Sequence, residues 1–210
     1  MIPSSEKPGV ARQGVDGLVV GLDVLAAGER TADRLLVQVI SLLQEAGAES
    51  LLAATHHVQV FGRSHVAMSI SLTGPVGRTR ALELVADAIA VDDGAAGALW
   101  TGETGTGLPS LQQSARVAAT EHRDQRSGRV VHFPGVEGLT GVVSLCSVLE
   151  TAIDRIDPFD GRPLPNALLM TGDVLRPRWL DGELVLHVRP GTGGVWVPTD
   201  VTDPAVSRPE

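Results

Sequence analysis

The stretch from Leu51 to Pro75, LLAATHHVQVFGRSHVAMSISLTGP, contains the clearest structural pattern in the sequence. Two apolar, β-branched runs flank the tetrapeptide FGRS, and Gly62 within it can supply the positive φ of a tight turn. We therefore predict a β-hairpin at the centre of an antiparallel sheet. With the turn centred on this tetrapeptide, the predicted register pairs Val60 with His65, Val58 with Ala67 and His56 with Ser69.

Side chains alternate along a strand, so each strand of the hairpin sorts into two faces. The first face is mostly apolar and is expected to lie on helices. It carries Leu51, Ala53, Thr55, His57, Gln59, Phe61, Val66, Met68, Ile70 and Leu72. The second, which we call the polar face, gathers imidazoles and hydroxyls. It carries Ala54, His56, Val58, Val60, His65, Ala67, Ser69, Ser71 and Thr73.

The polar face has two interpretations. It is either the water-facing side of an antiparallel sheet, or a ligand-binding face, since imidazoles donate, accept and titrate near neutral pH. In the second interpretation His56 and His65 are the candidate catalytic residues, and Ser69, Ser71 and Thr73 are the candidate ligand-binding residues. Two His with neither a carboxylate nor a Cys on the face do not favour a zinc site, so no metal or cofactor is predicted.

Charge and composition narrow the class of protein. The 210 residues carry a net charge of −8, which disfavours binding to nucleic acid or to an anionic membrane. No secretory signal and no apolar run of membrane-spanning length occurs, which predicts a soluble, cytoplasmic protein. The single cysteine, Cys146, excludes an intrachain disulfide and is predicted to be a buried thiol in a helix. The expected partner is a small molecule or another protein, and a homo-oligomer is compatible with the sequence.

The order of elements predicts an α+β fold. The first hundred residues predict the β-α-β-β-α-β order of a ferredoxin-like sandwich, with a largely antiparallel sheet and helices on one face. Its elements are a strand over 17–24, a helix over 31–46, the hairpin, a helix over 78–91 and a strand over 95–100. The second half predicts an αβα arrangement followed by a β-meander. Its elements are helices over 110–122 and 140–156, and strands over 128–133, 167–170, 174–179, 183–188 and 195–197.

A single domain over 15–199 is expected between disordered tails at 1–14 and 200–210, with a subdivision near 101–109 compatible with the pattern. The glycine-rich segment 101–107, TGETGTG, lacks the glycine spacing and the Lys-Ser/Thr pair of phosphate-binding loops. It is predicted to be a flexible connector. Asp173 and His187 are further site candidates, with a turn former and a half-buried strand residue as the alternatives.

One family resemblance accompanies the hairpin. The residues Arg63-Ser64-His65 and the run Leu72-Thr73-Gly74-Pro75-Val76, on a β-α-β-β order, resemble bacterial S-adenosylmethionine decarboxylases. Those enzymes form a pyruvoyl group by self-cleavage at the Ser of Glu-Ser-His, followed by His-Thr-Trp-Pro-Glu. The Glu, the Trp and the second His are missing here. The resemblance therefore implies a related fold without the cleavage chemistry.

Two functional hypotheses remain. The first is a small-molecule-binding protein or enzyme of unknown reaction that uses the polar face. The second is a non-catalytic interaction or assembly subunit, because the sequence lacks Gly-x-Ser-x-Gly, His-Glu-x-x-His and Cys-x-x-Cys motifs and its short C-terminal strands could present pairing edges. A pocket lined by His56 and His65 would favour the first hypothesis. A large exposed apolar patch would favour the second.

Overall fold

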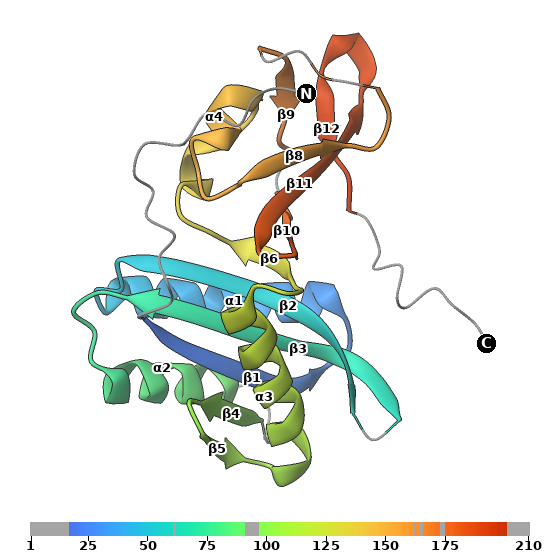
Figure 1. The fold of residues 1–210 in the computed structure, drawn as a ribbon. Coiled ribbons are helices and arrows are strands. Elements are labelled where there is room, and N and C mark those ends of the chain that lie inside the picture. The colour runs from blue at the N-terminus through green and yellow to red at the C-terminus, as the bar shows by residue number, and fades with distance from the viewer. Residues whose placement is uncertain are drawn as a thin grey trace.

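The computed structural model describes residues 17–60, 62–90, 97–161, 163, 166–172 and 175–200. The first half comprises β1 (Leu18–Ala26), α1 (Glu29–Glu45), β2 (Ser50–Val60), β3 (Arg63–Thr73), α2 (Arg78–Ala90) and β4 (Ala98–Thr101). Its strands lie in the order β4-β1-β3-β2, and every neighbouring pair is antiparallel (Figure 1). The predicted α+β class and mostly antiparallel sheet are confirmed.

The second half continues the same sheet beyond β2. It comprises β5 (Thr104–Gly107), α3 (Pro109–Asp124), β6 (Arg129–His132), η1 (Val136–Gly138), β7 (Val142–Ser144), α4 (Leu145–Leu149), β8 (Arg155–Pro158), β9 (Leu168–Met170), β10 (Arg178–Leu180), β11 (Glu183–Pro190), η2 (Thr192–Gly194) and β12 (Trp196–Pro198). From β2 the strands follow in the order β6-β10-β11-β12-β9-β7, with β8 beside β11 and β5 at the far edge on β4. Two pairs are parallel, β8 with β11 and β9 with β12.

The central hairpin forms as predicted, but the predicted register is wrong by two residues. Its pairs are Val58 with His65, His56 with Ala67, and Ala54 with Ser69. Gly62, with φ of +73°, lies in a turn only two residues long. A shift by an even number of residues keeps every side chain on its face. The division into an apolar and a polar face is therefore unaffected.

Helices α1 and α2 cover the apolar face. The core between them and the sheet is formed by buried aliphatic side chains, namely Leu36, Val39, Leu43, Ala81, Val85, Leu51, Met68, Ile70 and Leu72. Burial of one such Leu, Ile or Met contributes about 1.5–3 kcal/mol before the cost in conformational entropy.

Helix α3 covers the polar face, so the prediction that the helices share one face is wrong. Figure 1 shows α3 in front of the sheet and α1 behind it. The approach is close because the contact residues are small. A Cβ added at Gly21 would lie 1.9 Å from the carbonyl oxygen of Ala115, and Ala118 packs on Val58 and Ala67.

Two predictions for the second half are also wrong. Segment 101–107 is no flexible connector, because it turns at Gly102, with φ of +62°, and forms β5 against β4. The helix predicted over 140–156 is replaced by β7 and the five-residue α4. Gly141, with φ of +71°, interrupts any helix, and Ser144 caps α4 by accepting a hydrogen bond from the Ser147 N–H. Cys146, predicted to be buried, is exposed.

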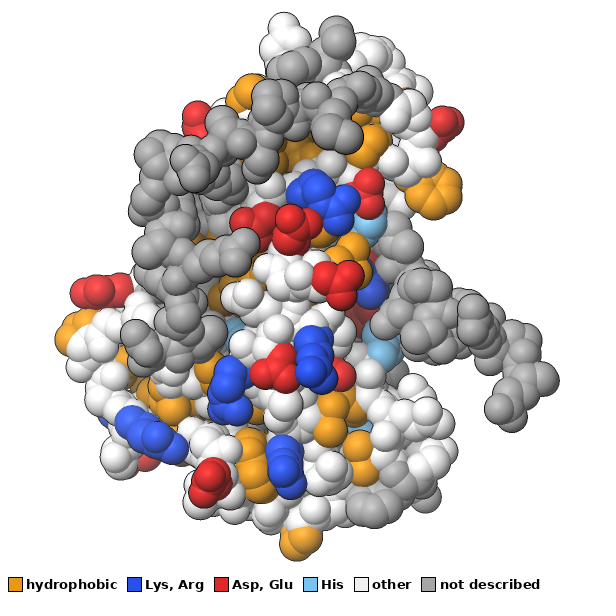
Figure 2. Space-filling model, in the orientation of Figure 1, with side chains coloured by type: hydrophobic (Ala, Val, Ile, Leu, Met, Phe, Trp, Pro, Cys, Tyr) orange, Lys and Arg blue, Asp and Glu red, His pale blue; other side chains and the backbone are white. Residues whose placement is uncertain are grey.

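The tail predicted over 1–14 lies outside the described residues, as do residues 201–210 of the tail predicted over 200–210, and Asp173. On the face drawn in Figure 2, charged side chains of both signs stand next to one another. Among the described helices, none has both the length and the apolar character needed to cross a lipid bilayer.

Candidate functional site

A chain of hydrogen-bonded side chains lies between α3 and the polar face. The hydroxyl of Ser69 is 2.7 Å from His56 Nε2 and 2.7 Å from His122 Nδ1. His56 Nδ1 is 3.0 Å from Oε2 of Glu121, and that same oxygen accepts a hydrogen bond from Ser127 at 2.7 Å. We call these five residues the His56–Ser69 network.

Three elements bring the network together. His56 lies on β2 and Ser69 on β3, on the same face by strand alternation. Glu121 and His122 occupy the last turn of α3, which ends at Gln125 in the left-handed conformation. The loop that follows folds over the imidazole of His56, since a Cβ added at Gly128 would lie 2.7 Å from its Cε1 atom.

The two ends of the network differ in charge: Glu121 is ionised and His122 is neutral. Burial alone would raise the pKa of Glu121, but hydrogen bonds from His56 and Ser127 outweigh it and lower that pKa on balance. Burial, with smaller contributions from the charges of His56 and Arg123, lowers the pKa of His122 to about 3. At neutral pH Glu121 is thus a carboxylate and His122 an uncharged imidazole.

Two proton arrangements satisfy every bond of the chain. With His56 neutral, its Nδ1–H donates to Glu121, the Ser69 hydroxyl donates to His56 Nε2, and His122 Nδ1–H donates to Ser69 Oγ. With His56 protonated, its Nε2–H donates to Ser69 Oγ, and the hydroxyl turns to donate to His122 Nδ1. A proton gained by His56 therefore reverses the chain and changes the tautomer of His122, which is the behaviour of a proton relay.

The distances also fit a nucleophile, a base and a carboxylate that orients the base, in the order Ser69, His56, Glu121. Ser69 and His56 are buried, however, and α3 lies over them. A substrate carbonyl has no approach to the hydroxyl while α3 is docked. The arrangement can move a proton, and it does not present a nucleophile.

A second pair, Asp23 and His65, lies on the same face. His65 Nε2 is 2.6 Å from Oδ2 of the fully buried Asp23, whose Oδ1 accepts the N–H of Leu25. Leu25, whose N–H donates to Asp23, has a φ of +52°, which is unusual for a bulky side chain. His65 Nδ1 is buried, and none of the described residues forms a hydrogen bond with it.

The five predicted site residues share one face but fall into different environments. His56 and Ser69 belong to the network, and His65 lies with Asp23. Ser71 is half-buried and Thr73 is exposed, further along β3. Ser64, which the resemblance aligns with a self-cleaving serine, is an exposed residue opposite Gln59.

Sequence reasoning missed Asp23, Glu121, His122 and Ser127. Asp23 carried a usable signal, because a lone carboxylate in an otherwise apolar strand must find a partner when buried. The other three carried none, since the register of one helix over the opposite sheet face is a tertiary property.

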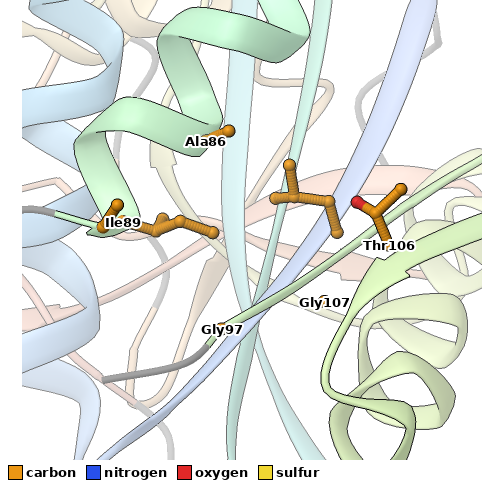
Figure 3. Close-up of a pocket in the computed structure, with 7 residues that line it drawn as sticks. Ala86, Ile89, Gly97, Thr106 and Gly107 are labelled. Carbon is orange, nitrogen blue, oxygen red and sulfur yellow. The ribbon is translucent and has the colours of Figure 1, made fainter. Parts of the chain in front are cut away.

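Two cavities lie away from the network. One, of about 260 Å³, opens between α2 and the β4–β5 hairpin, where Ala86 and Ile89 face Gly97, Thr106 and Gly107 (Figure 3). The other, of about 500 Å³, lies between α1 and the second half. Its lining residues are Val37, Val131, Val136, Leu139, Thr140, Gly141, Gly172, Leu175 and Arg176.

In the part of the chain that the structure describes, no group of three His, Cys, Asp or Glu side chains is placed to hold a metal ion. No protein-family model matches the sequence, and no curated protein or solved structure matches it either.

Proposed function

We propose that this protein binds a small polar molecule on the polar face, with His56 as the group that exchanges a proton with it. The observation that carries the proposal is the continuous chain Glu121–His56–Ser69–His122. The role of Ser69 is to couple the two imidazoles. Ser71 and Thr73 orient the ligand, and His65 is the second proton donor or acceptor of the face.

The network contributes little free energy to the packing of α3 on the sheet. Polar groups buried under α3 lose their bonds to water, and hydrogen bonds inside the protein return only about 0.5–1.5 kcal/mol net each. Apolar residues of similar volume often fill such sites with equal or greater stability. The neighbouring contact of Ala118 with Val58 and Ala67 is already apolar. Proton exchange with a ligand is a reason to keep the polar residues.

The polar face comes close to solvent at two places, near Glu121 and along β3. Glu121 is 30% exposed and joins the buried imidazole of His56 to solvent. At the other end, exposure increases along β3 from Ser69 through Ser71 to Thr73. A ligand that approaches along these three hydroxyls meets Thr73 and Ser71 first, and it contacts the buried Ser69 only where α3 moves aside.

The test is a nuclear magnetic resonance titration of the full chain with a library of small carboxylates, amides, alcohols and sugars. We expect at least one compound to shift the amide signals of Ser69, Ser71 and Thr73 and the imidazole signals of His56. The His56→Ala and His65→Ala variants should stay folded and lose this response. If no compound shifts these signals, or if both variants respond as the parent does, the proposal is wrong.

A second candidate is assembly through the β7 edge, the last strand in the described sheet order. Val142 pairs with Met170 and Ser144 with Leu168, so Val142, Leu168 and Met170 share one side, and all three are exposed. A homo-oligomer formed there would appear in size-exclusion chromatography with light scattering and would dissociate in Met170→Asp. A monomer at every concentration would exclude this candidate.

We also propose that residues 18–101 form a ferredoxin-like unit. The order β4-β1-β3-β2, with antiparallel neighbours and both crossover helices on one face, supports this assignment.

A further inference from the structure

The second half has a polar sheet face of its own, independent of the site beneath α3. On β11 the side chains of Leu184, Leu186 and Val188 point into the core of the second half. Val185 and His187 therefore point to the opposite face. Arg178 pairs with Val185, and the N–H of Thr199 donates to the carbonyl of His187, so both neighbours project from that face.

Arg178 and Thr199 lie next to each other along one edge of β11. The main-chain groups of Leu184 and Val188 bond to the segment of β8, through Asp154 and Phe159. Alternation along β11 directs the groups of Val185 and His187 to the other edge. Along that edge, β10 pairs with the first residues of β11 and β12 pairs with the last ones.

The guanidinium of Arg178 lacks the partners that its neighbours have. Arg129 bonds to Asp33 and Asp200, and Arg176 bonds to Asp33 and to two carbonyl groups. The Arg178 side chain is 13% exposed. Its Nε is buried, and in the part of the chain that the structure describes it has no hydrogen-bond partner. Its Nη2 is 3.8 Å from Oδ1 of Asp200. That distance is too long for a hydrogen bond.

The hydroxyl of Thr199 is a second donor without an acceptor among the described residues. Its Oγ1 is buried, and no described residue forms a hydrogen bond with it. Buried polar groups in folded proteins are almost always bonded, so two unpaired donors side by side indicate a missing acceptor.

We propose that Arg178 and Thr199 bind a small oxyanion, a carboxylate or a phosphate group. One ligand oxygen accepts from Arg178 Nε–H and from Thr199 Oγ1–H, and a second accepts from Arg178 Nη2–H in the paired geometry that guanidinium favours. The second ligand oxygen lies beside Nη2, where Oδ1 of Asp200 is 3.8 Å away and makes no hydrogen bond, while Oδ2 of Asp200 keeps its bond to Arg129 Nε.

The test is calorimetric titration of the full chain with acetate and, separately, with inorganic phosphate, at constant ionic strength held with chloride. Arg178→Gln is expected to bind about tenfold more weakly, because it loses a charge-assisted pair, and Thr199→Val should be weakened in the same direction. Asp200→Asn should bind more tightly than the parent, because the competing carboxylate is gone. A response to acetate alone identifies a carboxylate ligand, and a response to phosphate identifies a phosphate.

Arg155→Gln is the matched control. It removes a guanidinium from the same sheet face, but one that is already paired with Glu183 and Asp157, and it should bind as the parent does. Equal anion affinity in the parent, Arg178→Gln and Thr199→Val would overturn the proposal. So would the absence of binding in both the parent and Asp200→Asn while both are folded.

Discussion

At the residue scale, Ser69 is the point on which the buried network depends. One hydroxyl serves two imidazoles, so its removal leaves both His56 Nε2 and His122 Nδ1 without a partner in a buried site. The loss of a partner for a buried polar group costs more than the hydrogen bond itself contributes. A single conservative substitution should therefore be costly here.

Ser69→Ala should lower the free energy of unfolding by about 1–3 kcal/mol. Urea denaturation followed by circular dichroism measures this value. Ser110→Ala, at an exposed position of α3, is the control and should change it by less than about 0.5 kcal/mol. Equal stability of the two variants would show that the hydroxyl does not bridge the imidazoles.

His122 predicts a pH dependence whose sign follows from its lowered pKa. The unfolded chain takes up a proton near pH 6.5, whereas the folded protein does so only near pH 3. This residue therefore stabilises the fold fully above pH 6.5, and stability falls by about 1.4 kcal/mol per pH unit as the pH drops through that window. In His122→Asn, whose amide can still donate to Ser69, the fall in unfolding free energy between pH 6 and pH 4 should be shallower. An identical slope would contradict the burial of a neutral His122.

At the element scale, the docking of α3 depends on the absence of a side chain at Gly21. Gly21→Ala would place a methyl group 1.9 Å from the carbonyl oxygen of Ala115, so the helix must move away from the sheet. Overpacking of this kind costs about 1–3 kcal/mol, and the network beneath α3 should open at the same time. Thermal denaturation and faster hydrogen exchange at the His56 amide measure the two effects. Gly138→Ala, where a Cβ meets nothing within 4 Å, should resemble the parent.

The elements also show how far the sequence predicts the structure. The period-two pattern of the hairpin placed His56, His65 and Ser69 on one face. This prediction is correct although the predicted register was wrong by two residues, because an even shift keeps each side chain on its face. The position of α3 was not predictable, because half of its buried residues are Ala and two others are polar, which gives a weak apolar stripe. The helix predicted over 140–156 failed because short apolar runs fit a strand as well as a helix, and here they form β7, the five-residue α4 and the start of β8.

At the scale of the whole molecule, an ion-pair cluster joins the two halves. Asp33 of α1 accepts hydrogen bonds from Arg129 on β6 and from Arg176, which precedes β10. Burial lowers the pKa of Arg176 although Asp33 opposes this. For Arg129 burial also acts to lower the pKa, but the bond to Asp33 and the charges of Asp33, Asp200 and Glu29 outweigh it and raise the pKa. Both guanidinium groups thus share the Asp33 carboxylate.

Asp33→Ala should lower the free energy of unfolding by about 3 kcal/mol, because it leaves two largely buried guanidinium groups without that carboxylate. Limited proteolysis should cut the second half first, since its attachment to α1 is weakened. Glu83→Ala removes a carboxylate from an exposed pair with Arg80 and should change stability by less than about 1 kcal/mol. Similar losses in the two variants would mean that the cluster does not hold the halves together.

We infer that the His56–Ser69 network serves a function other than stability, and the triple variant His56→Leu/Ser69→Ala/His122→Leu provides the test. This variant removes both imidazoles and the hydroxyl between them, so none of the three positions keeps an unpaired hydrogen-bonding group. We predict a free energy of unfolding equal to or greater than that of the parent, in contrast to the loss in Ser69→Ala alone. A triple variant less stable than Ser69→Ala would contradict the claim and make the network a structural support for α3.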